Sequence, residues 1–210
     1  MTALPGSTML VLALAAQTPS LPPAYPRAGA SKLLENDRVV VWQIAWLKGQ
    51  PSPLHRHIYD LVGLYYEPGD RMIIAPDGTR RPVSTKAGDI AFQLKGITHI
   101  EEGTSDAPLR AVFVEMKDAG PTGTIAPAPE GAPPAFAEIG ARSLLDNERV
   151  AVWTYSYGFG NEGPRHRHVR DAVVVWIEGT KPRAAFVPAG TMHTEEQAGV
   201  TAQATVFELK

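Results

Sequence analysis

The sequence contains no cysteine, which excludes disulfide bonds, thiolate metal ligands and cysteine nucleophiles. It also lacks any extended block of lysines or arginines, and its 20 basic residues nearly balance 22 acidic ones. Such a charge balance gives no electrostatic reason to expect a nucleic acid or an anionic membrane as partner. The expected partner is therefore a small-molecule substrate, and a metal or catalytic site has to be built from histidine and oxygen ligands.

A long hydrophobic run is also missing. The apolar stretch at residues 9–16 (MLVLALAA) is too short to cross a bilayer, so no membrane span is expected. Its small residues are typical of a signal-peptidase site and favour export to a periplasm, whereas the absence of a preceding Lys or Arg keeps a cytoplasmic location open. We assign residues 1–28 to an N-terminal extension that ends in a proline-rich connector.

Proline and glycine, with 19 residues each, are abundant. They separate short β-branched runs, such as the three valines at 39–41 and the three at 173–175. Turn residues between short β-branched runs are typical of an all-β chain without long helices.

An internal repeat is the strongest organisational signal. Residues 29–42 (GASKLLENDRVVVW) align without gaps on residues 140–153 (GARSLLDNERVAVW), with nine of fourteen positions identical at an offset of 111. A Pro/Gly/Ala-rich segment separates the copies and is expected to be a linker. We therefore expect two domains, at 29–118 and 139–210, joined by a linker at 119–138.

The second copy is shorter than the first. Around the last histidine of each copy the offset falls from 111 to 94, so copy two has lost 17 residues. The loss lies in a stretch of copy one, residues 67–89, that is rich in the turn dipeptides of a β-hairpin. The second domain is therefore expected to lack about one hairpin.

The repeat accounts for every histidine in the chain. Copy one holds His55, His57 and His99, and copy two holds His166, His168 and His193. A His-x-His pair on a strand places both imidazoles on one face, and a third histidine from a distant strand can complete a metal site. Three imidazoles suit divalent Fe, Mn, Ni, Cu or Zn and leave coordination positions open. The alternative is a metal-free binding pocket.

These residues carry a family resemblance. Gly49-x5-His55-x-His57 and Gly160-x5-His166-x-His168 resemble the first cupin motif, and the glycine-x2-histidine pairs ending at His99 and His193 resemble the second. The resemblance implies two tandem double-stranded β-helix (jelly-roll) barrels with a metal inside each, a bicupin. The start of each copy and the HRHxxD core are similar to small cupins linked to β-alanine degradation. Cupins also associate through sheet faces, so a homodimer is expected, unless the two domains already pair within the chain.

The acidic residues depart from the cupin pattern. The family has a glutamate ligand three or four residues after the histidine pair, whereas Asp60 and Asp171 follow after only two intervening residues. We treat both aspartates as ligands or as acceptors that orient a ligating imidazole. Glu101 and Glu195, two residues past the third histidine, are alternative acids, expected at the rim of the site.

Three functions agree with these motifs. The first is an Fe(II) dioxygenase acting on a small organic molecule, because three neutral histidines leave the ion its full charge and open positions. The second is a non-redox metal enzyme such as a lyase, isomerase or decarboxylase, and the third is a binding module without turnover. Because copy one keeps the hairpin, its site is expected to be the better enclosed one.

Overall fold

The computed structural model describes residues 20–118, 141–156, 165–194 and 203–210. All secondary structure in these ranges is β, which confirms the expected fold class. The first barrel contains nine strands: β1 (Ala30–Glu35), β2 (Val39–Trp46), β3 (His55–Arg56), β4 (Asp60–Glu67), β5 (Gly69–Ile74), β6 (Arg80–Thr85), β7 (Ile90–Gln93), β8 (Thr98–Gly103) and β9 (Leu109–Met116). The second contains seven: β10 (Arg142–Asp146), β11 (Val150–Ser156), β12 (His166–Arg167), β13 (Ala172–Glu178), β14 (Lys181–Val187), β15 (Met192–His193) and β16 (Gln203–Leu209).

Barrel 1 is formed by two antiparallel sheets that face each other. One has the strand order β1-β2-β9-β4-β7 and the other the order β3-β8-β5-β6. Strands distant in sequence are neighbours in both sheets, as in a jelly roll.

Barrel 2 repeats this plan without one hairpin. Its larger sheet, β10-β11-β16-β13-β14, corresponds strand for strand to the larger sheet of barrel 1. Within the described residues, its smaller sheet consists of β12 and β15, the counterparts of β3 and β8. Strand β13 turns directly into β14 through Gly179, which adopts a positive φ of 60°, where barrel 1 inserts β5 and β6. The expected loss of one hairpin in the second barrel is confirmed.

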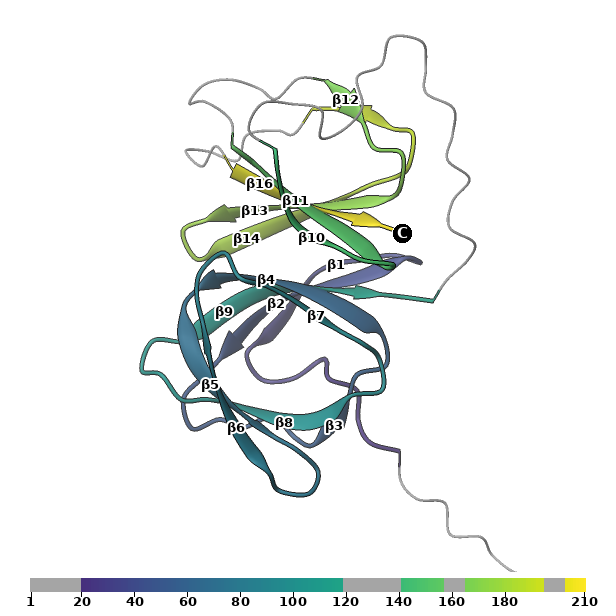
Figure 1. Cartoon of the computed structure of the whole chain (residues 1–210). Coiled ribbons are helices and arrows are strands. Elements are labelled where there is room, and N and C mark those ends of the chain that lie inside the picture. The colour runs from purple at the N-terminus through teal and green to yellow at the C-terminus, as the bar shows by residue number, and fades with distance from the viewer. Residues whose placement is uncertain (1–19, 119–140, 157–164, 195–202) are drawn as a thin grey trace, which may run out of the picture.

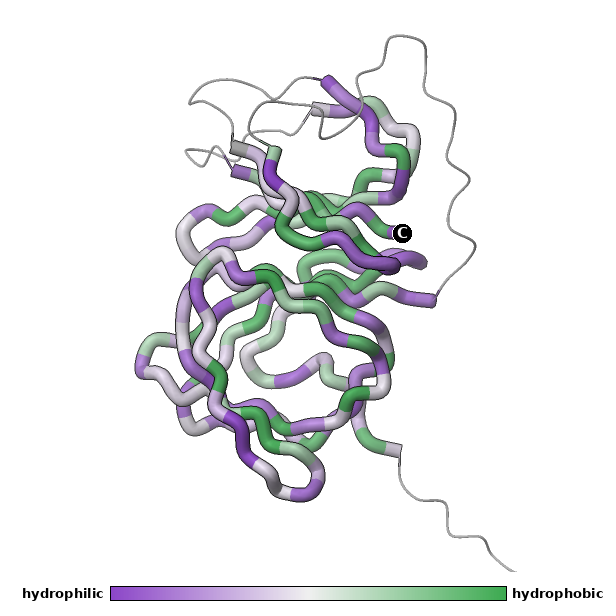
Figure 2. Tube along the Cα trace, in the orientation of Figure 1, coloured by the Kyte–Doolittle hydropathy of each residue, from purple (hydrophilic) through white to green (hydrophobic). Residues whose placement is uncertain are grey.

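The two larger sheets pack face to face and bury a core between the barrels (Figure 1). Strand β2 shows how one strand serves two cores. Val39 and Val41 point into the core between the barrels, while Val40 and Trp42 point into the interior of barrel 1. Because side chains alternate across a strand, a run of three valines buried on both faces is explained by this sandwich. Figure 2 shows hydrophobic residues concentrated where the barrels meet.

The face that a second copy would use for pairing is thus covered within the chain. Val173 and Val175 of β13 join Val62 and Leu64 of β4 in the same buried cluster. The sequence suggested either a homodimer or pairing of the two domains within the chain. The structure has the intrachain pairing, and the homodimer stays a prediction. Among the described residues, no helix is long and apolar enough to cross a bilayer.

Part of the segment expected to be a connector enters barrel 1. Ala24 and Tyr25 are buried, at 2% and 5% exposure, and belong to the interior cluster of this barrel. The backbone N–H of Arg56 donates to the carbonyl of Pro22 at 3.0 Å, which fixes the segment beside β3. The apolar run at 9–16 and the linker at 119–138 lie outside the described residues.

Candidate metal centres

The first histidine triad lies on the smaller sheet of barrel 1. His55 on β3 is paired with His99 on β8, and His57 follows β3 with its side chain on the same face as His55. The three ring centroids are 4.8 to 5.1 Å apart. Each ring offers a nitrogen within 4.8 Å of the others, and all three side chains are buried. The structure thus brings together the three residues that the sequence selected.

Hydrogen bonds orient the first of these rings. The carbonyl of Pro53 lies 2.9 Å from Nδ1 of His55, and because a carbonyl only accepts, Nδ1 carries the proton. The other nitrogen, Nε2, is then an unprotonated lone-pair donor. Within the described part of the chain Nε2 has no hydrogen-bond partner and is buried. Such a nitrogen is suited to bind a metal ion.

The triad is held in its neutral form. Burial lowers the pKa of His57 to about 3, assisted by the neighbouring His99 and His55. Burial likewise lowers the pKa of His99 to about 4 and lowers the pKa of His55. Neutral imidazoles are the metal-binding form of histidine, so near neutral pH no proton competes with an ion at this site.

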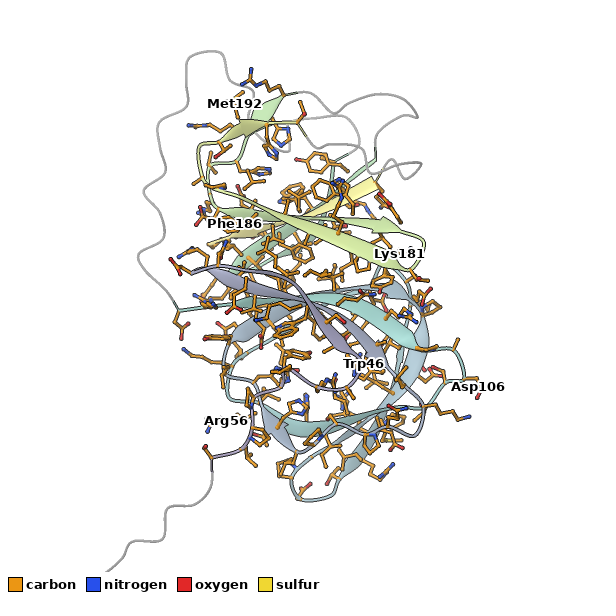
Figure 3. All side chains as sticks on the ribbon, turned by 180° about the vertical axis from the view of Figure 1, so that it is seen from behind. Trp46, Arg56, Asp106, Lys181, Phe186 and Met192 are labelled. Carbon is orange, nitrogen blue, oxygen red and sulfur yellow. The ribbon has the colours of Figure 1, made fainter. Side chains whose placement is uncertain are left out.

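The second triad has the same construction. His166 on β12 is paired with His193 on β15, and His168 follows β12. Their ring centroids are 4.6 to 5.0 Å apart, and each offers a nitrogen within 4.8 Å of the others. The two triads lie on the outer sheets, at opposite ends of the molecule (Figure 1). Figure 3 shows Met192, next to His193, at the end of barrel 2 that is far from barrel 1.

Glu101 is buried next to the first triad and not at its rim. Burial alone would raise the pKa of this carboxyl, but the guanidinium groups of Arg27 and Arg71 outweigh it and lower the pKa to about 2. Arg27 and the indole N–H of Trp46 both donate to one oxygen, at 2.8 and 3.0 Å, and Arg71 lies 3.5 Å from the other. Because its oxygens are engaged in this way, Glu101 lies outside the group that can hold an ion. Glu195 lies outside the described residues.

Asp60 and Asp171 bind elsewhere too. One oxygen of Asp60 accepts the backbone N–H of Lys95, in the turn before β8, and the other pairs with Arg149 of barrel 2. Asp171 makes the equivalent bond to the N–H of Ala189, also in the turn that leads to the third histidine. Neither aspartate belongs to a metal-competent group among the described residues. They fix the turn that precedes the third histidine and join the barrels, roles that the sequence did not suggest.

Solved structures of low sequence identity share this architecture, although no family model and no curated protein matches the sequence. AerE from Microcystis aeruginosa superposes with a TM-score of 0.62 over 91% of this chain and 98% of its own, at 10% identity. A cupin 2 conserved barrel domain protein from Leptotrichia buccalis covers 86% of this chain and 88% of its own, with a TM-score of 0.49 and 13% identity. A cupin domain from Bordetella pertussis covers 48% and 99%, with a TM-score of 0.40 and 23% identity.

The chain thus shares its fold, two tandem β-barrels, with AerE. The glycines of the cupin motifs occupy turns that need them: Gly49 has a φ of 69°, Gly96 of 90° and Gly190 of 81°. Side chains with a Cβ rarely adopt these angles. The resemblance that the sequence suggested therefore extends from the histidines to the backbone around them.

The donor set of the first triad fits a divalent transition metal ion. Nε2 of His55 is unprotonated and buried, with no hydrogen-bond partner among the described residues. Nε2 of His57 and Nε2 of His99 approach to 3.2 Å, a contact in which one ring has to donate unless an ion lies between them. Orphaned lone pairs that converge in this way are expected of metal ligands.

The residues around the first triad were missed by sequence reasoning. Tyr25 and Arg27 lie in the segment taken for a connector, and Arg71 lies in the hairpin that only copy one keeps. Trp46 is the last residue of β2, and the guanidinium carbons of Arg27 and Arg71 lie 5.5 and 5.0 Å from the centroid of its ring. Figure 3 shows Trp46 inside barrel 1. The one sequence feature that could have indicated these neighbours is the aromatic Tyr25 and the basic Arg27 at the end of the proline-rich segment.

Proposed function

We propose that this protein is a metal-dependent cupin that acts on a small organic molecule as an Fe(II) dioxygenase. The observation that supports this proposal is the buried triad of His55, His57 and His99, whose arrangement on paired strands recurs in barrel 2. The fold and the triads support a metal-binding cupin. The assignment of iron and of dioxygenase chemistry goes beyond them and rests on the charge of the ligands. The link to β-alanine degradation stays a prediction.

The choice of iron follows from the charge of the ligands. A divalent iron held by three neutral imidazoles keeps its full double charge and open coordination positions, as dioxygenase chemistry requires. The residues His55, His57 and His99 would hold the ion, with His55 oriented through the carbonyl of Pro53. The carboxylate of Glu101 forms salt bridges with Arg27 and Arg71, so it is not available as a general base for proton abstraction.

We assign the working site to barrel 1. Ser52 and Pro53 both contact Nδ1 of His55, at 3.2 and 2.9 Å, and Ser52 also accepts the backbone N–H of Glu101. At the repeat offset of 111, copy two has Gly163 in place of this serine. A ligand whose partners are themselves fixed is held more rigidly, which favours the first triad for catalysis.

Metal analysis of tag-free protein tests the proposal. After anaerobic reconstitution with Fe(II), we expect about two ions per chain in the wild type and about one in each of two double variants, His55→Ala/His57→Ala and His166→Ala/His168→Ala. Arg56→Ala is the matched control, because Arg56 lies between the two histidines and is exposed. A folded wild type that takes up no Fe, Mn, Ni, Cu or Zn would refute metal binding.

Oxygen consumption then separates the chemistries. The Fe(II) form should consume dioxygen in the presence of a substrate, and His55→Ala/His57→Ala should abolish this consumption while His166→Ala/His168→Ala keeps it. Product formation without oxygen consumption would replace the dioxygenase by a lyase, isomerase or decarboxylase. Metal uptake without turnover of any small carbonyl, catechol or carboxylate compound would leave a binding module.

A further inference from the structure

The charges beside the first triad do not balance. Arg27 and Arg71 are both buried, with side-chain exposures of 8% and 9%, and among the described residues Glu101 is the single acid that pairs with them. Glu115, another buried carboxyl of barrel 1, accepts the indole N–H of Trp42 and forms no salt bridge with either arginine in the described part of the chain. The group around Glu101 therefore carries one uncompensated positive charge. Isolated buried charges are costly, so a counterion is expected.

Hydrogen-bond donors are also left over in the same place. The hydroxyl of Tyr25, Nε of Arg27 and Nη1 of Arg71 are buried without a hydrogen-bond partner among the described residues. Each unsatisfied buried donor costs about 1–3 kcal/mol. All three can donate a hydrogen bond, and two belong to guanidinium groups, whose planar fork matches a carboxylate.

A metal ion in the triad increases the imbalance. Three neutral imidazoles would leave its charge uncompensated, and the pKa values of Tyr25 and Tyr65 are raised by burial, so neither phenol supplies a negative charge. We propose that barrel 1 binds a small carboxylate next to the triad of His55, His57 and His99, held by Arg27, Arg71 and Tyr25. This inference rests on the proposed function and names the class of its substrate.

The aromatic rings beside the two arginines limit the size of the ligand. Tyr25 and Trp46 belong to the buried cluster inside barrel 1, and the guanidinium carbon of Arg27 lies 5.5 Å from the centroid of each ring. The guanidinium carbon of Arg71 lies 5.0 Å from the Trp46 ring. A ligand that reaches both guanidinium groups has to fit among packed aromatic side chains, so a compact carboxylate is expected.

The second barrel lacks this subsite. The counterpart of Arg71 is lost with the missing hairpin, and the position equivalent to Arg27 at the repeat offset of 111 is Glu138. The two triads thus share their histidines and differ in the charge beside them. Carboxylate binding is expected in barrel 1 alone.

Isothermal titration with acetate and with acetamide tests the subsite, because these molecules have the same size and differ in charge. The titrations use the full chain at constant ionic strength, both metal-free and loaded with Zn(II), which has no redox activity. We expect the wild type to bind acetate at least about tenfold more tightly than acetamide, with a larger preference in the Zn(II) form. Arg71→Met should lose most of this preference, Arg71→Lys should keep part of it, and Arg183→Met, in barrel 2, should leave it unchanged.

The outcomes separate this inference from the proposed function. Equal binding of acetate and acetamide by folded wild type, or an unchanged preference in folded Arg71→Met, overturns the subsite even if metal binds. A preference for acetate in the metal-free protein supports the subsite even if metal uptake fails. If Arg71→Met does not fold, as judged by circular dichroism, then Arg27→Met and Arg71→Lys decide: a preference unchanged in both overturns the subsite.

Discussion

Arg38 of barrel 1 forms a salt bridge with Asp171 of barrel 2, with 3.1 Å between its Nε atom and a carboxylate oxygen. The same contact runs in the opposite direction from Arg149 of barrel 2 to Asp60 of barrel 1, at 2.8 Å. Both arginines and both aspartates are related by the repeat offset of 111. Each barrel therefore contributes an arginine to the other, as the two subunits of a symmetric dimer would.

Replacing Arg149 by methionine tests the contribution of this interface. Asp60 is 8% exposed and would keep only the backbone N–H of Lys95, whereas the side chain of Arg149 is 34% exposed, which moderates the loss. We expect the free energy of unfolding to fall by about 1–2 kcal/mol in urea denaturation.

The control for this variant is Lys48→Met, which removes an exposed ion pair with Asp106 and should leave the free energy of unfolding unchanged within measurement error. If Arg149→Met is no less stable than this control, the salt bridge between the barrels contributes nothing measurable. In that case the apolar core between the sheets alone joins the barrels.

Glu115 gives a prediction for the pH dependence of stability. Burial raises the pKa of this carboxyl in the folded protein above its ordinary value in the unfolded chain, so between the two values the folded state binds more protons than the unfolded state. This carboxyl therefore lowers stability as the pH rises through that window. Glu115→Gln removes the effect and keeps an oxygen to accept the indole N–H of Trp42.

The measurement is the difference in unfolding free energy between Glu115→Gln and the wild type, from pH 4 to pH 8, because other ionisable groups cancel in this difference. We expect the variant to gain stability relative to the wild type as the pH rises. A difference that is constant with pH would show that the pKa of Glu115 is the same in both states.

The fold was predictable because both copies of the repeat contain the same pattern of strands and turns. Gapless alignment of the copies located the strands, and the change in offset located the missing hairpin at β5 and β6. Pairing of the two domains was expected as the alternative to a homodimer, but the larger sheets were not predicted as the faces that meet. The valine runs at 39–41 and 173–175 agree with strands that are buried on both faces. The same run is expected of any fully buried strand, so it does not reveal which sheet covers the second face.

The grouping of the histidines into triads was predictable, and their surroundings were not. A His-x-His pair and a distant third histidine follow from strand periodicity. Arg27 and Arg71 reach the triad from a terminal segment and from a hairpin, and only tertiary packing brings them to Glu101. Asp60 was assigned near the metal by its distance in sequence, yet its side chain faces the turn at Lys95 and the other barrel.

Ser52 tests how the first triad is oriented. Its hydroxyl oxygen accepts the backbone N–H of Glu101 and lies 3.2 Å from Nδ1 of His55. Ser52→Ala leaves His55 with the carbonyl of Pro53 as its remaining partner, and loss of such a supporting contact typically weakens metal binding 10–100-fold. We expect a loss of about tenfold in Zn(II) affinity at one of the two sites.

Competition with a chromophoric chelator measures both affinities in one titration. Ser52→Ala should be compared in the background of His166→Ala/His168→Ala, where the first site alone remains. The same substitution in the background of His55→Ala/His57→Ala is the control and should have no effect. An unchanged affinity in the first background would show that Pro53 alone orients His55.

A pair of residues inside barrel 1 shows how the copies diverged together. Gly63 of β4 lies opposite Phe113 of β9, and a Cβ at Gly63 would overlap the phenylalanine ring. The equivalent pair in barrel 2 is Val174 opposite Val206, both buried in the interior of that barrel. The same position in the barrel interior is therefore filled by a glycine and a phenylalanine in barrel 1 and by two valines in barrel 2.

Gly63→Val should therefore destabilise the protein by about 2 kcal/mol through overpacking, and Phe113→Val by a similar amount, about 2 kcal/mol, through the cavity that it leaves. The double variant rebuilds the valine pair of barrel 2, so we expect it to be more stable than the sum of the single changes predicts, by about 1–2 kcal/mol. Urea denaturation of all four proteins measures this coupling. If the two changes are additive, the stability of barrel 1 does not depend on the fit between residues 63 and 113. Trp46 and Tyr65, which contact the Phe113 ring, would then have adjusted to the change in side-chain volume.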